Sequence, residues 1–251
     1  MKLDGSSKIS DDKVAFALHS YLWGKAENRL GVINPVTERI PHLGLSPATS
    51  GVNLRVGSKV KFQFMDLANV PGWPNGERVA VATYFLIRGE YEQLDQFLHD
   101  DKHAGRDILL LGHPGIGLWM FQVFEAITNY TASGKTVYLT YSLVKRLAEG
   151  RPTFFCAQET RRYLFQASGV YKVSGEAFGV SRASFIEDQS DNTLCLYDLN
   201  ANQKEFINTR GWRVVVASSP KEERYKEWAK QANAVKFVMR TWPWREIYAS
   251  R

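Results

Sequence analysis

A glycine-rich segment in the middle of the chain could bind phosphate. It consists of Gly112-His-Pro-Gly-Ile-Gly117 and directly follows Ile108–Leu111, an unbroken run of apolar residues. Such a run is typical of a strand that is buried on both faces of a parallel sheet. Glycines after such a strand allow several backbone N–H groups to point at one anion. The segment therefore predicts a phosphate site at the end of this strand.

A working phosphate loop also needs a lysine for the β- and γ-phosphates and a hydroxyl for Mg²⁺. The next residues, Leu118 and Trp119, can supply neither group, but Lys135-Thr136 opens a helix predicted over Val137–Leu147. When residues 118–134 are left out, strand, loop and helix join as a complete Gly-x-x-x-x-Gly-Lys-Thr motif. The residues that we predict to bind nucleotide are Gly112, Pro114, Gly115, Ile116, Gly117, Lys135, Thr136 and, from a later strand, Ser218.

Residues 118–134 form a 17-residue insert without Lys or Arg and with several large apolar residues. In one interpretation, it is translated from a retained intron or results from a misplaced exon boundary. In a second, it is a genuine insertion that splits the loop. In a third interpretation, Gly117 starts a helix directly and the later Gly-Lys-Thr is a coincidence. We favour the first, because this composition is odd for an exposed excursion. We expect the insert to carry Lys135 and Thr136 away from the glycines, so that the chain as written binds ATP poorly or not at all.

Asp198 follows the apolar strand residues Leu194–Tyr197, where an acidic side chain can hold a magnesium ion. An Asp that caps a turn is the alternative, but the phosphate loop upstream favours the metal role. Many ATPases place a catalytic Glu directly after this Asp, whereas Leu199 follows here and Asn200 is the nearest polar side chain. We therefore predict Asp198 and Asn200 as catalytic residues, and Thr136 and Asp198 as metal ligands.

Ser218 ends the strand Val214–Ala217 and is the candidate for a contact with the γ-phosphate. Ser219 precedes Pro220 and is an equally good cap for the following helix. A hydrolase site at these serines is a distant alternative, because they lack a Gly-x-Ser-x-Gly elbow and no His follows them.

The elements that must position these residues alternate between strands and helices after Arg106. The further strands are predicted over Thr153–Cys156, Thr193–Tyr197, Val214–Ala217 and Val235–Val238, with a hairpin over Tyr163–Val173 and a helix over Pro220–Ala232. This alternation predicts a three-layer α/β domain with a mostly parallel sheet.

The first 77 residues carry no motif that we can connect with chemistry. The sequence predicts a helix after Ser10, a loop over 30–52, a hairpin around Gly57-Ser58, and then a helix over Tyr84–Leu98. We expect a small α+β region over residues 1–77 and the P-loop NTPase-like domain over 78–251.

The composition of the 251 residues excludes several classes of protein. It is 44% hydrophobic and 23% charged, with no apolar run near the roughly 18 residues that a membrane span needs and no secretory signal. Cys156 and Cys195 lie in apolar runs and are expected to be reduced core thiols. The net charge is +6, of which +5 falls in residues 151–251, which permits contact with nucleic acid. We expect an intracellular protein, cytoplasmic or nuclear, without a membrane partner.

Residues 78–251 resemble the P-loop proteins of the retrotransposon hot spot and Crinkler type. The resemblance lies in the rejoined loop, in Glu149–Pro152, in Tyr197–Leu199, in Ser219-Pro220 before Tyr225-x-x-Trp228, and in Trp242-Pro-Trp244. It implies an ATPase-like module of the AAA or STAND kind, with ATP and Mg²⁺ as cofactors, in nuclear factors or host-directed effectors. The implied partner besides nucleotide is a protein or nucleic-acid target in the nucleus. The N-terminal region does not resemble the ubiquitin-like header of Crinklers, and we expect the C-terminal lid to be missing.

Together, these features predict a nucleotide (ATP)-binding P-loop NTPase-like module that the insert 118–134 impairs. It would be an ATPase if the loop were intact and a pseudoenzyme as written. The alternative is a non-catalytic interaction or nucleic-acid-binding effector that retains only the fold. Salt-dependent DNA binding without a requirement for ATP would favour that alternative.

Overall fold

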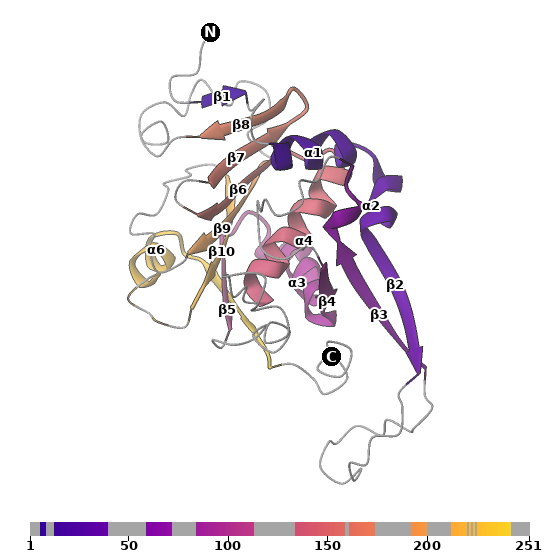
Figure 1. Ribbon diagram of the computed structural model, residues 1–251. Helices are drawn as coiled ribbons and strands as arrows, with labels where there is room; N and C mark the ends of the chain where they lie inside the picture. Colours follow the sequence, from indigo (N-terminus) through magenta and orange to yellow (C-terminus); the bar gives the residue numbers. More distant parts are fainter. Residues whose placement is uncertain are drawn as a thin grey trace.

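A computed structural model describes most of the chain (Figure 1). The described residues are 6–8, 13–39, 59–71, 84–112, 134–158, 161–173, 192–199, 212–219, 221, 223 and 225–241. The helices are α1 (Lys13–Leu22), α2 (Ala26–Val32), α3 (Gly89–His99), α4 (Gly134–Ala148) and α6 (Lys226–Gln231). Short 3₁₀ helices cover Leu67–Asn69 and Asp101–His103.

The described strands form two sheets. The larger sheet has eight strands: β1 (Ser6–Lys8), β5 (Ile108–Gly112), β6 (Thr153–Gln158), β7 (Arg161–Gln166), β8 (Gly169–Val173), β9 (Leu194–Leu199), β10 (Arg213–Ser218) and β11 (Val235–Met239). Their order is β1-β8-β7-β6-β9-β10-β5-β11. The smaller sheet has the order β2-β3-β4, from β2 (Ile33–Arg39), β3 (Lys59–Asp66) and β4 (Tyr84–Ile87).

The part of the large sheet that surrounds β5 is parallel. β6, β9, β10, β5 and β11 all run in one direction, while β7, β8 and β1 extend the sheet with antiparallel pairs. Every residue of β5 is buried, as its unbroken apolar sequence predicts. The prediction of an α/β fold with a mostly parallel sheet is therefore confirmed.

Helices cover both faces of this sheet, with α6 on one side and the other helices on the opposite side (Figure 1). Successive residues of a strand point to opposite faces. Ile108 and Leu110 accordingly pack in the cluster that contains α1, α3 and α4, whereas Leu109 and Leu111 pack in the cluster with Trp228 of α6. The result is an arrangement of three layers.

Helix α4 has the apolar stripe that the sequence predicts, with Leu143, Val144 and Leu147 buried. It ends at Ala148, and Gly150, two residues later, has a positive φ of 65° and donates its N–H to the carbonyl of Leu147 at 2.9 Å. A glycine adopts this left-handed conformation at little cost and stops a helix.

The N-terminal predictions are wrong in part. Residues 30–39 complete α2 and form β2 rather than a loop; Pro35 is tolerated because β2 is an edge strand. β3 pairs with β2 and β4, while the proposed first hairpin strand around Leu54 lies outside the described residues. The helix predicted over Tyr84–Leu98 begins at Gly89, because residues 84–87 pair with β3 as a strand.

The N-terminal segments join the same core as the rest of the chain. β1 pairs with β8 in the large sheet, and buried residues of α1 belong to the cluster around α4. The division at residue 78 stays a prediction. Both cysteines are free and buried, as expected. Within the described ranges, we find no helix with the length and apolarity needed to cross a membrane.

Candidate functional site

Three of the predicted site residues lie at the carboxyl ends of parallel strands. Gly112 ends β5, Asp198 is the last residue but one of β9, and Ser218 ends β10. β10 lies between the other two strands, and its Ala217 is in register with both Leu110 and Asp198. Parallel strands bring these ends to one edge of the sheet.

At this end of the sheet, the connections that leave neighbouring strands lead in opposite directions across the sheet. The chain leaves β5 through α4 for β6 on one side, whereas β11 pairs with β5 on its other side. In open α/β sheets, ligands bind outside the carboxyl ends of the strands at such a point. The topology therefore favours a ligand site beside Gly112.

Lys135 is brought to the end of β5. Its Nζ donates a hydrogen bond to the Gly112 carbonyl oxygen at 3.1 Å, and the residue is only 4% exposed. Burial lowers the pKa of Lys135, and the charge of Asp198 acts in the opposite direction. The expectation that the insert carries Lys135 away from the glycines is thus wrong with respect to Gly112. Helix α4 starts at Gly134 and points its first turn back at β5.

Thr136 and Asp198 form the second contact of the site. The Thr136 hydroxyl donates to Oδ2 of Asp198 at 2.6 Å. Burial raises the pKa of Asp198 to about 6, and the hydrogen bond from Thr136 and the charge of Lys135 limit the rise. At neutral pH, the carboxyl group is therefore mostly ionised.

A hydroxyl oxygen and a carboxylate oxygen in contact are suitable ligands for Mg²⁺. This ion commonly uses one or two carboxylates, with substrate phosphates and water completing its shell. Among the described residues, there is no cluster of three or more His, Cys, Asp or Glu side chains that could hold a metal. The pair Thr136–Asp198 thus fits Mg²⁺ bound together with a phosphate better than a site made of protein ligands alone.

Ser218 is buried at the end of β10, and its hydroxyl donates to the carbonyl oxygen of Ser219 at 3.1 Å. A contact with a γ-phosphate would require this hydroxyl to rotate. Pro114, Gly115, Ile116, Gly117 and Asn200 lie outside the described residues, as does the insert up to residue 133.

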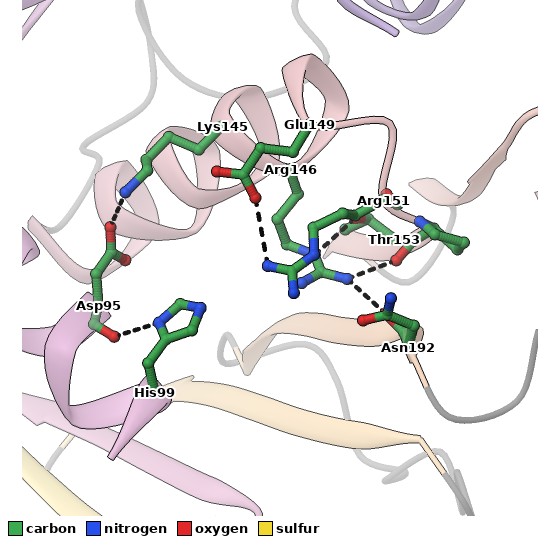
Figure 2. A network of polar contacts seen from close by, with 9 residues as sticks. Asp95, His99, Lys145, Arg146, Glu149, Arg151, Thr153 and Asn192 are labelled. Carbon is green, nitrogen blue, oxygen red and sulfur yellow. Dashed lines mark hydrogen bonds and ion pairs between the residues drawn. The ribbon is translucent and has the colours of Figure 1, made fainter. Parts of the chain in front are cut away.

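The far end of α4 is attached to other elements by polar side chains (Figure 2). Arg146 donates to the Thr153 hydroxyl at 2.9 Å and to the Asn192 carbonyl at 2.8 Å. Thr153 begins β6, and Asn192 lies two residues before β9. Lys145 forms an ion pair with Asp95 of α3. These contacts orient the helix whose first turn carries Lys135.

The sequence does not reveal one contact at the near end of α4. The Tyr91 hydroxyl of α3 donates to the carbonyl oxygen of Gly134 at 2.8 Å. The two residues are 43 positions apart, and Tyr91 is one apolar position among several in the sequence of its helix. No local spacing rule could have identified it.

Comparisons of the chain with protein-family models, curated proteins and solved structures found no match. The chemistry of the site is therefore inferred from the positions of its own residues. The Lys135 ammonium group and the start of the 15-residue helix α4 lie at the same end of the sheet as the Asp198 carboxylate. A helix N-terminus favours anions, so this combination suits a phosphate that is bound with a divalent cation.

Proposed function

We propose that the chain is a nucleotide-binding P-loop NTPase-like module of the retrotransposon hot spot and Crinkler type, with MgATP as its ligand. The observation that supports this best is the pair of contacts Lys135–Gly112 and Thr136–Asp198. They join three separate segments at the sheet edge where the sequence motif requires them. These contacts favour a functional Gly-Lys-Thr over a coincidental one, because both Lys135 and Thr136 reach side-chain or backbone groups that the motif would use.

Each residue has a role that fits its position. Lys135 would neutralise the β- and γ-phosphates, which receive N–H groups from the glycine loop and the start of α4. Thr136 would bind Mg²⁺ directly, and Asp198 would hold the ion or its water. Mg²⁺ supplies charge neutralisation of the phosphates. Burial of Lys135 strengthens its attraction for phosphate, because the surroundings screen charge less than water does.

The insert 118–134 impairs this function in our proposal. In the rejoined motif, Gly117 directly precedes Lys135, so the loop and the helix start surround one anion. In the chain as written, 17 additional residues separate them, so bringing the two ends of the loop together around one anion costs more entropy. We expect weak ATP binding and no ATP hydrolysis.

Titration calorimetry with MgATP tests both parts of the proposal. Three proteins are compared: the full chain, a variant that lacks residues 118–134, and the same variant with Lys135→Ala. We expect the deletion variant to bind at least about tenfold more tightly than the full chain, which corresponds to about 1.4 kcal/mol. Lys135→Ala should abolish this binding. Equal affinities of the full chain and the deletion variant would refute the impairment, and absence of binding to all three would refute the function.

A further inference from the structure

We infer that Tyr91 is a positioning residue for the phosphate-binding lysine, an inference that rests on the proposed function. Its hydroxyl donates to the carbonyl oxygen of Gly134 at 2.8 Å, and Tyr91 is 1% exposed. Gly134 is the first residue of α4 and directly precedes Lys135. The hydrogen bond therefore restrains the backbone that carries Lys135 and Thr136.

Tyr91 is itself held firmly. Its ring packs against the rings of Tyr138 and Tyr141 of α4, with centroids 5.6 and 5.7 Å apart. A large aromatic ring in such a cluster has little freedom to move its hydroxyl group. The donor is thus in place before any ligand arrives.

The start of α3 is also fixed to the edge of the sheet that carries the site. Arg88 donates to the Arg240 carbonyl at 3.1 Å, and Glu90 accepts from the Arg240 N–H at 2.7 Å. Arg240 follows Met239, which is in register with Gly112. Tyr91 thus connects Gly134 to a support that does not involve the insert.

This connection explains how Lys135 can remain at Gly112 although residues 113–134 separate them. Phosphate contacts are sensitive to position, since an error of about 1 Å can cost about 100-fold in rate. Loss of one buried hydrogen bond at Gly134 should therefore change phosphate binding more than it changes the fold.

Tyr91→Phe is the test variant, and Tyr138→Phe is its matched control. The Tyr138 hydroxyl donates to Oδ1 of Asp95 at 2.9 Å, and Tyr138 is also fully buried. Each variant removes one hydroxyl from the same cluster of rings. Only the first removes the hydrogen bond to the residue before Lys135.

Two measurements apply to both variants. Hydrogen exchange of the ligand-free full chain is followed in peptides from the start of α4 and from β9. Affinities for MgATP and AMP are measured in the full chain and in the variant without residues 118–134. That deletion yields the same protein as a deletion of residues 117–133, because residues 117 and 134 are both glycine. A glycine carbonyl therefore remains available to Tyr91.

We expect Tyr91→Phe to speed exchange at the start of α4 and to leave β9 unchanged. MgATP affinity should fall about three- to tenfold, as for one hydrogen bond, while AMP affinity changes less than twofold. AMP has no β- or γ-phosphate for Lys135, so a merely structural defect would weaken both ligands equally. Tyr138→Phe should leave both affinities within about twofold of the parent.

Several outcomes would overturn the inference. Unchanged exchange at the start of α4, faster exchange in β9 as well, or equal losses for MgATP and AMP would each do so. A parent protein that binds no nucleotide would instead refute the proposed function, and with it the role of Tyr91 in binding. The exchange data would still show whether Tyr91 anchors α4, so the two failures are distinguishable.

Discussion

The carboxyl group of Asp198 has a pKa of about 6, which is above the usual value for aspartate because of burial. Its charge is nearly complete above about pH 7 and is lost as the pH falls through 6. Protonation would remove a proposed metal ligand, and metal binding weakens as its ligands gain protons. We therefore predict that MgATP affinity is constant above about pH 7 and falls by up to about tenfold per pH unit below 6.

The measurement is calorimetry between pH 5 and 8 on the variant without residues 118–134, with Asp198→Asn as its control. The asparagine variant should bind weakly and show no transition near pH 6, because its side chain does not titrate. A transition that persists in Asp198→Asn would mean that another group controls the pH dependence.

Thr136 donates the hydrogen bond that limits the rise in the pKa of Asp198. Thr136→Val keeps the shape of the side chain but removes the donor, so we predict that the pKa of Asp198 rises above 6. NMR titration of the carboxyl carbon measures this change. MgATP binding should also weaken, because the proposed hydroxyl ligand of Mg²⁺ is lost.

Thr140→Val is the matched control on the same helix. The Thr140 hydroxyl donates to the Thr136 carbonyl at 3.2 Å, one turn further along α4, and the residue is buried. This variant should leave the pKa of Asp198 unchanged. An equal rise in both variants would show that a general disturbance of α4, and not the hydroxyl of Thr136, affects Asp198.

At the scale of elements, α4 is attached at its far end by Arg146. Its guanidinium donates to the Thr153 hydroxyl and to the carbonyls of Pro152 and Asn192. Burial lowers its pKa to about 10, so it remains charged at neutral pH. Arg146→Met would leave these acceptors without their donor, at an expected cost of about 2–4 kcal/mol of unfolding free energy.

Arg151→Met is the control for this prediction. Arg151 pairs with Glu149 at 3.3 Å, and both side chains are about a third or more exposed. Exposed ion pairs contribute little, so urea unfolding should change by less than about 0.5 kcal/mol. Similar losses in the two variants would contradict the view that Arg146 attaches α4 to β6 and β9.

The elements that build the site were predictable because their signals are local. β5, β9 and β10 are short apolar runs, and α4 has an apolar stripe and is followed by Gly150. β2 was missed because its pairing with β3 outweighs its loop-like composition. The contact of Tyr91 with Gly134 was missed for the same physical reason. Contacts between distant segments depend on the folded chain and leave no pattern within either segment.

At the scale of the whole molecule, deletion of the insert 118–134 tests the interpretations of the split motif. The Nζ atom of Lys135 already lies 3.1 Å from the carbonyl oxygen of Gly112. Residues 113–117 can span up to about 17 Å, which exceeds an extended lysine side chain and one hydrogen bond. The rejoined loop can therefore close without movement of β5 or α4.

We predict that deletion of residues 118–134 stabilises the fold. The connection between Gly112 and Lys135 shortens roughly fourfold, and each halving of a loop is worth about 0.6 kcal/mol, so the expected gain is about 1 kcal/mol. Urea unfolding measures it, and a variant with a Gly/Ser segment of equal length in place of the insert controls for packing. If the insert contributes apolar packing to the fold, both variants lose stability. That result would support a helix that continues directly from Gly117, because removal of the insert lowers the free energy of unfolding only if the insert packs against the rest of the molecule.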